Sequence, residues 1–91
     1  MKNLKEIEAL VMQGNLTEAY DELTAFLAKD GQNASGWFML GNIYRRKNQW
    51  EDAINAYNKA KYYNPEGPAD AAIESVYEKI RSIRSVIDSL S

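Results

Sequence analysis

A chain of 91 residues is long enough for one small domain, and its formal net charge of -2 lacks the basic excess of a nucleic-acid-binding protein. Histidine and cysteine are both absent, which removes the commonest general base, the two commonest transition-metal ligands and any disulfide. The sequence therefore predicts no enzyme, no metal site and no cofactor, and it predicts no binding to nucleic acid.

The N-terminal segment has no feature of export or membrane insertion. Residues 1–16 mix Lys and Glu with apolar residues, so they lack the continuous apolar core of a signal peptide. No later stretch approaches the roughly 20 apolar residues that cross a membrane. We expect a cytoplasmic protein that does not bind membranes.

Two helices are expected in the first third of the chain. The first begins after Asn3, which can cap it together with Glu6 three residues later. Gly14 breaks this helix, Asn15 is expected to cap the second, and Gly31 ends the second. Apolar residues recur every three or four positions in both segments: Leu4, Ile7, Leu10 and Val11, then Leu16, Ala19, Tyr20, Leu23, Phe26 and Leu27.

The middle of the chain carries the densest pattern. The residues expected to share a buried side are Trp37, Leu40, Gly41 and Tyr44 in one helix, and Ala53, Tyr57 and Ala60 in the next. Gly41 and Ala53 are small where the two helices must approach closely, which leaves room for the large rings. Asn48 and Gln49 make the turn, and Pro65 ends the second helix because the residue before a proline is forced out of the helical region.

A last helix is expected to start with Pro68 in its first turn, where the missing backbone N–H costs nothing. It continues to the end of the chain without another Gly or Pro. Its apolar residues alternate by three and four positions, as in the seam of a coiled coil: Ile73, Val76, Ile80, Ile83, Ile87 and Leu90.

Residues 34 positions apart occupy the same register in the first and middle segments: Leu10 and Tyr44, Leu16 and Trp50, Ala19 and Ala53, Leu23 and Tyr57, and Phe26 and Ala60, the last pair being a departure from the pattern. With W-x-x-L-G-x-x-Y, A-x-x-x-Y and a late Pro, this period resembles the tetratricopeptide repeat (TPR) of two antiparallel helices. The resemblance implies a small stand-alone protein with an all-α fold, a right-handed α-solenoid of about five helices. We expect a single domain over residues 1–91, with a divergent first repeat (1–33), a full second repeat (34–67) and a capping helix (68–91).

The resemblance also implies a function, because the first helices of successive repeats in this family line a concave groove that holds a peptide or a partner's helix. The leading prediction is therefore protein–protein interaction through this groove. The corresponding groove residues are Ser35, Phe38, Asn42, Arg45 and Arg46 in the middle repeat, Glu8 and Met12 in the first repeat, and Val76, Lys79 and Ile80 in the last helix.

The polar groove residues allow two interpretations. In the first, Arg45 and Arg46 pair with a carboxylate of the ligand, and Asn42 bonds an extended backbone through its donor and its acceptor. In the second, the two arginines form a solvated helix end that compensates the helix dipole.

One family function is not expected. Members that grip the carboxyl terminus of heat-shock chaperones use a clamp of Lys, Asn, Asn, Lys and Arg. The matching positions of this chain hold Leu4, Glu8, Met39, Ala69 and Ile73. None of the clamp residues is present, so we expect no chaperone-tail binding of that kind.

The end of the last helix supports a second prediction. Ile83, Ile87 and Leu90, here called the C-terminal stripe, lie beyond the length of an ordinary repeat helix and need another neighbour. That neighbour is a second copy of the chain, the groove itself or a different protein. The runner-up function is thus a homo-oligomeric structural adaptor, such as a homodimer, that self-associates through the C-terminal stripe.

Overall fold

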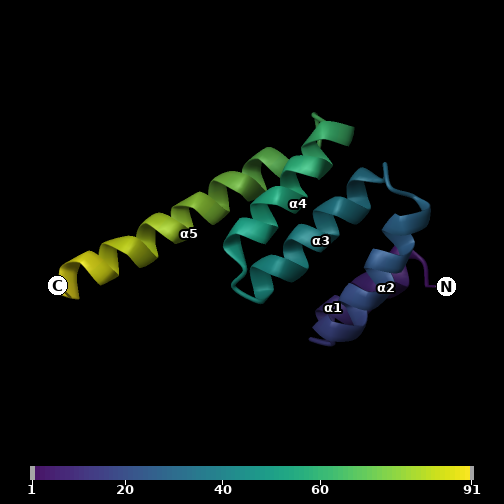
Figure 1. Cartoon of the computed structure of the whole chain (residues 1–91), viewed down its shortest axis with the longest axis horizontal. Helices are drawn as coiled ribbons and strands as arrows, with labels where there is room; N and C mark the ends of the chain where they lie inside the picture. The colour runs from purple at the N-terminus through teal and green to yellow at the C-terminus, as the bar shows by residue number, and fades with distance from the viewer. Residues whose placement is uncertain (1, 91) are drawn as a thin grey trace.

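Five α-helices follow one another in residues 2–90, the part of the chain that the computed structural model describes (Figure 1). They are α1 (Leu4–Met12), α2 (Leu16–Lys29), α3 (Ala34–Arg46), α4 (Trp50–Tyr63) and α5 (Ala69–Leu90). The two end residues of the expected domain, Met1 and Ser91, lie outside the described residues. The expected all-α fold is confirmed, and the molecule measures 49 × 28 × 17 Å along its principal axes.

The first hairpin, α1 and α2, begins with the predicted capping box. The backbone N–H of Glu6 donates to the Asn3 side chain at 2.9 Å, and the backbone N–H of Asn3 donates to the Glu6 carboxylate at 3.2 Å. Gly14 makes the turn with a φ of +82°, a conformation that glycine adopts without steric cost. Asn15 is the N-cap residue of α2, as expected, but its side chain makes no capping hydrogen bond; its amide donates to the Gln13 side chain at 3.3 Å.

The second hairpin, α3 and α4, is closed by a small residue set against a large one. A Cβ atom built on Gly41 would lie 2.5 Å from the ring of Tyr57, so only glycine allows this approach. Asn33 caps α3 by accepting from the backbone N–H of Gly36 at 2.9 Å. The predicted turn contains Asn48 with a φ of +62°, which asparagine tolerates better than most residues.

Helix α5 follows the turn after α4 and packs along it. It begins at Ala69, one residue later than expected, so Pro68 precedes the first turn and its carbonyl accepts from the Ala72 N–H at 3.2 Å. Lys61 of α4 and Asp70 of α5 form an exposed salt bridge at 2.8 Å across this contact.

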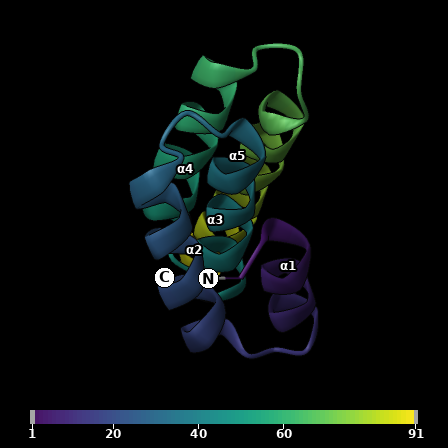
Figure 2. The same cartoon turned by 90° about the vertical axis from the view of Figure 1, so that its right-hand side faces the viewer.

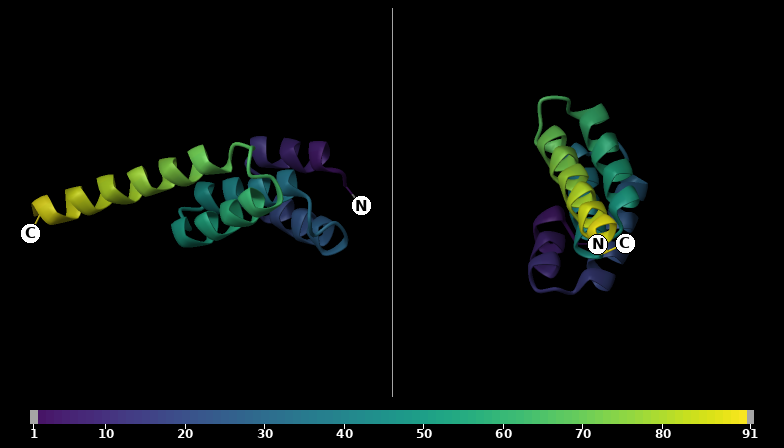
Figure 3. Two further views of the ribbon diagram at one scale, coloured as in Figure 1. Left: turned by 90° about the horizontal axis from the view of Figure 1, so that it is seen from above. Right: turned by 90° about the vertical axis from the view of Figure 1, so that its left-hand side faces the viewer.

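The two ends of α5 differ in their surroundings. Its first half buries Ala69, Ala72 and Val76 in a cluster that also contains Tyr57 of α4. Its second half extends past the other four helices toward the C-terminus (Figure 3, left) and is exposed from residue 81 onward.

The helices form two layers. The first helices of the hairpins, α1 and α3, lie with α5 on one side of the molecule, and α2 and α4 lie on the other (Figure 2). The expected seam of α3 is buried at Leu40 and Gly41, but Trp37 and Tyr44 are only partly buried at its edges. Ile43, which the sequence pattern did not single out, is fully buried because α3 is covered by α2 as well as by α4.

Candidate functional site

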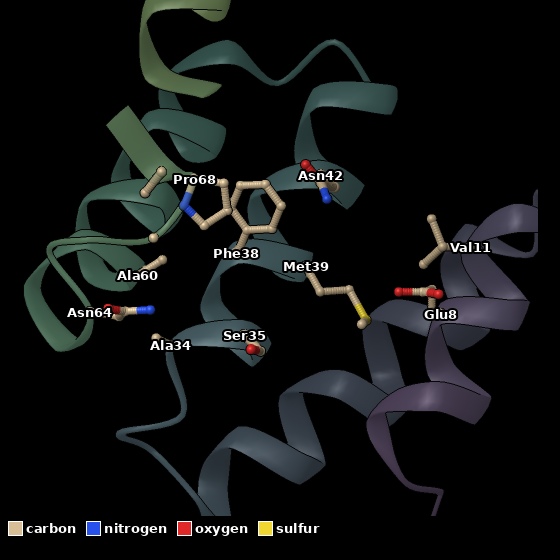
Figure 4. Close-up of a pocket in the computed structure, with 12 residues that line it drawn as sticks. Glu8, Val11, Ala34, Ser35, Phe38, Met39, Asn42, Ala60, Asn64 and Pro68 are labelled. Atoms are coloured by element: carbon tan, nitrogen blue, oxygen red, sulfur yellow. The ribbon is translucent and has the colours of Figure 1, made fainter. Parts of the chain in front are cut away.

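A hollow of about 260 Å³ opens on the side of the molecule formed by α1, α3 and the start of α5 (Figure 4). We call this hollow the concave groove. Its apolar lining includes Val11, Phe38, Met39 and Pro68, and its polar lining includes Glu8, Ser35, Asn42 and Asn64. It is therefore an apolar depression with a few polar groups, the usual composition of a ligand-binding cleft.

The floor of the concave groove is the ring of Phe38. This ring lies at a tilt against the ring of Tyr57, with 5.3 Å between their centroids, and Pro68 stands beside it (Figure 4). Because Tyr57 is itself fully buried and lies against Gly41, the floor rests on a closely packed contact between α3 and α4.

Asn42 lies on the wall of the groove with one of its two polar atoms in use. The Tyr57 hydroxyl donates a hydrogen bond of 2.5 Å to Asn42 Oδ1. Burial raises the pKa of the Tyr57 hydroxyl, while the positive charge of Arg45 acts in the opposite direction. The hydroxyl thus keeps its proton as a donor, which fixes the Asn42 amide so that Nδ2 remains the group that can donate to a ligand.

The two arginines hold neighbouring helices in place. Arg45 Nη2 donates to Ser75 Oγ of α5 at 2.6 Å. Arg46 Nη1 donates at 2.6 Å to the backbone carbonyl of Val11 in the last turn of α1, which also accepts from the Gly14 N–H at 3.0 Å. Both guanidinium groups therefore link α3 to the helices on either side of it, a role that neither interpretation of the sequence included.

The structure brings together four of the ten predicted groove residues. Glu8, Ser35, Phe38 and Asn42 line the same hollow. They come from α1 and α3, so the groove crosses the boundary between the two repeats.

The other predicted groove residues lie elsewhere. Val76 is completely buried against α4, so its assignment to the groove is corrected: residues of α5 that face α4 are not open to a ligand. Met12 is 75% exposed at the end of α1 and Lys79 is exposed on α5, but neither lines the hollow. Ile80 lines a different depression beside Trp50.

Several lining residues were missed as groove residues, among them Met39, Asn64 and Pro68. Met39 entered the sequence analysis only as a position without a clamp residue, yet its side chain points across the hollow toward Glu8 (Figure 4). Asn64 and Pro68 were assigned only to the end of one helix and the start of the next. The turn between them borders the groove, and the close spacing of Pro65 and Pro68 was the available signal of an ordered turn.

A second apolar surface lies at the end of α5. The exposed fractions there are 39% for Ile83, 57% for Val86, 59% for Ile87 and 83% for Leu90. Where α5 passes the start of α4, a depression of about 320 Å³ is lined by Trp50, Ile80, Ile83, Arg84 and Ile87. Its surface is almost wholly apolar, in contrast to the concave groove.

Within residues 2–90, His, Cys, Asp and Glu side chains form no group of three or more that could hold a metal ion. In the same range, no helix combines the length and the apolar character needed to span a membrane.

Comparisons with known proteins agree with this architecture. A family model described as a tetratricopeptide repeat matches residues 34–66, and comparison with curated proteins finds no match. The solution NMR structure of the Bacteroides fragilis protein BF1650 is similar to this chain, with 32% sequence identity and a TM-score of 0.81 over 89% of this chain and 83% of that one. Repeats of this kind generally mediate protein–protein interaction, and their fold is typically a non-catalytic interaction module. The matched repeat, together with the similarity to BF1650 along most of the chain, shows that this chain belongs to the tetratricopeptide repeat family.

Proposed function

We propose that this protein is an interaction module that binds a peptide or a helix of another protein in its concave groove. The observation that carries the proposal is the open hollow of about 260 Å³ whose floor is Phe38 and whose wall presents Asn42. An apolar depression with a fixed hydrogen-bond donor suits an apolar anchor side chain with a backbone carbonyl beside it.

The lining residues define the chemistry of the preferred ligand. Phe38, Met39 and Pro68 supply the apolar contacts, so the ligand inserts an aliphatic or aromatic side chain between them. Asn42 Nδ2 donates to a main-chain carbonyl of the ligand. Glu8, exposed at the α1 edge of the hollow, favours a Lys or Arg close to that anchor.

The test uses peptides selected on the wild-type protein from a random-sequence display library, with affinities measured by calorimetry. Ser35 is exposed on the groove, so Ser35→Trp fills the hollow without opening the core. We expect this variant to weaken binding of the selected peptides by at least roughly tenfold, because the anchor side chain loses its place.

A matched control makes the same change on the opposite layer. Ala25 is exposed on α2, and we expect Ala25→Trp to leave the affinity unchanged. Equal affinities of the wild type and Ser35→Trp for every selected peptide would show that binding does not use the groove.

A second candidate function has its own observation. The exposed Ile83, Ile87 and Leu90 support a homo-oligomeric structural adaptor that self-associates through the C-terminal stripe. Sedimentation equilibrium separates the two functions, because Ile83→Asp with Ile87→Asp abolishes self-association and leaves peptide binding intact. A protein that stays monomeric at millimolar concentration would exclude this second function.

A further inference from the structure

The apolar side of α5 extends beyond the part of α5 that α4 covers. Ile73, Val76 and Ile80 pack in the cluster shared with α4. Helix α4 begins at Trp50, which lies beside Ile80 and Ile83. From there to the end of α5, no other helix of residues 2–90 covers the same side (Figures 1 and 3).

The uncovered segment has a defined length and direction. It runs from Ile80 to Leu90, which is about 16 Å of helix at 1.5 Å per residue. Helix α4 runs antiparallel to α5 (Figure 1), so a further helix placed on the uncovered segment continues the line of α4 beyond Trp50. The three-four alternation of the exposed residues matches another helix of the same period better than an extended strand.

We propose that the occupant of this segment is α5 of a second copy of the chain, packed antiparallel, an inference that rests on the adaptor function given above as the second candidate. In this register Ile83 meets Ile87 of the second copy, and Ile80 meets Leu90 of the second copy. Both pairs are centred on residue 85 of each copy, so a single two-fold axis through that point generates both pairs. The four residues of the three-four alternation, Ile80, Ile83, Ile87 and Leu90, then each face an apolar residue of the second copy.

A parallel arrangement is excluded by α4. It would place the first half of the second copy's α5, from Ala69 onward, on the side that α4 already covers. The antiparallel arrangement avoids this collision, since the two stacks lie at opposite ends of the paired segments. The contact between α4 and α5 within each chain is thereby extended by the contact between the two copies of α5.

The depression beside Trp50 receives the end of the second copy's helix. Its lining by Trp50, Ile80 and Ile83 is apolar, and its volume of about 320 Å³ accommodates the side chain of Leu90 from the second copy. Arg84 borders the same depression and faces Arg84 of the second copy near the axis. Apolar contacts drive this self-association, and the repulsion between the two arginines opposes it. Added salt screens that repulsion, so we expect the dimer to become tighter as the salt concentration rises.

The dimer has a consequence for the concave groove. Each stack keeps its own groove, since Ser35, Phe38 and Asn42 lie on α3 and take no part in the α5 contact. The dimer therefore carries two grooves at its two ends and binds two copies of a ligand, or one ligand with two sites, more tightly than a single groove does.

Disulfide trapping tests the register, because the natural chain contains no cysteine. Ile83→Cys and Ile87→Cys are prepared separately, one with and one without ¹⁵N label, then mixed and oxidised with oxidised glutathione. We expect the mixed disulfide between positions 83 and 87 to exceed either same-variant disulfide by roughly tenfold, since only that pair brings the two Cβ atoms within bonding distance. Mass spectrometry identifies each product by its label.

Two further measurements separate failure of the register from failure of self-association. Tyr62→Cys, exposed on α4, gives the background of disulfides formed by collision. Sedimentation equilibrium follows wild type and Ile87→Asp, for which we expect a dimer at least roughly a hundredfold weaker. A wild-type dimer in which same-variant disulfides predominate overturns the register but keeps the adaptor function. A wild-type monomer overturns both and leaves binding in the concave groove unaffected.

Discussion

The two halves of α5 share one sequence pattern and have opposite surroundings. In the first half, Val76 is completely buried in a cluster with Tyr57, whereas in the second half Ile87 is 59% exposed. The alternation of apolar residues by three and four is the same in both. The comparison teaches that periodicity identifies the apolar side of a helix, while the length of the neighbouring helix decides where that side is buried.

The largest expected effect comes from placing the same charge in each half. Val76→Asp buries a carboxylate without a partner and is expected to lower the free energy of unfolding by about 4 kcal/mol. Val86→Asp changes an exposed side chain and is expected to change it by less than about 0.5 kcal/mol. Urea unfolding at low protein concentration, where any dimer is dissociated, measures both. Similar losses in the two variants would contradict the difference between the halves.

A smaller loss of stability is expected from a change at the contact between Gly41 and Tyr57, which supports the first half of α5. Gly41→Ala sets a Cβ 2.5 Å from the Tyr57 ring, and Tyr57 belongs to the same cluster as Val76. We expect a loss of about 2 kcal/mol, because the ring must move within a closely packed cluster. Ser82→Ala, in the exposed half, is the control and is expected to change stability by less than about 0.5 kcal/mol. An unchanged urea midpoint for Gly41→Ala would show that the two helices separate easily.

Alkaline pH is expected to destabilise the packed helices and to leave the exposed end of α5 unchanged. The hydroxyl of Tyr20 and burial raise the pKa of Tyr44 from 10.0 to about 12, and burial raises the pKa of Tyr57. Because the folded state holds these protons more tightly, their stabilisation is complete below pH 10 and is lost as the pH rises through about 12. Residues 81–90 contain no tyrosine, so their exposure does not change in this range.

The measurement is the urea midpoint as a function of pH, with phenolate absorbance recorded in parallel. Tyr57→Phe is expected to cost about 1 kcal/mol at neutral pH, through the lost hydrogen bond to Asn42, and to reduce the alkaline loss. A midpoint that stays constant up to pH 12 would contradict the role given to these hydroxyls.

Much of the fold was predictable because local signals and the 34-residue period agree. Asn3 and Glu6 form the capping box that their spacing indicates, and Gly41 of α3 lies against the ring of Tyr57 of α4. The family model covers only the second of these hairpins, whereas the register of the first was visible from pairs such as Ala19 and Ala53. Asn15 takes the predicted N-cap position, but its side chain makes no capping hydrogen bond because its backbone, with ψ at 64°, lies outside the extended region typical of such caps.

The candidate site was predictable only in part. Ser35, Phe38 and Asn42 follow from helical geometry, since they lie on one side of α3. The contacts of Arg45 with Ser75 and of Arg46 with the Val11 carbonyl depend on how α5 and α1 lie beside α3. A pattern within one helix carries no information on such contacts between helices, so the sequence offered only a ligand contact or a solvated helix end for the two arginines.

Binding in the concave groove can be mapped by the amide chemical shifts of the ¹⁵N-labelled protein during titration with a selected peptide. We expect the largest shifts on α1 near Glu8, on α3 from Ser35 to Asn42 and on the turn at residues 64–68, which all border the hollow. The amides of residues 81–90 should stay in place at constant protein concentration. Shifts confined to α2 and α4, or to the end of α5, would contradict binding in the concave groove.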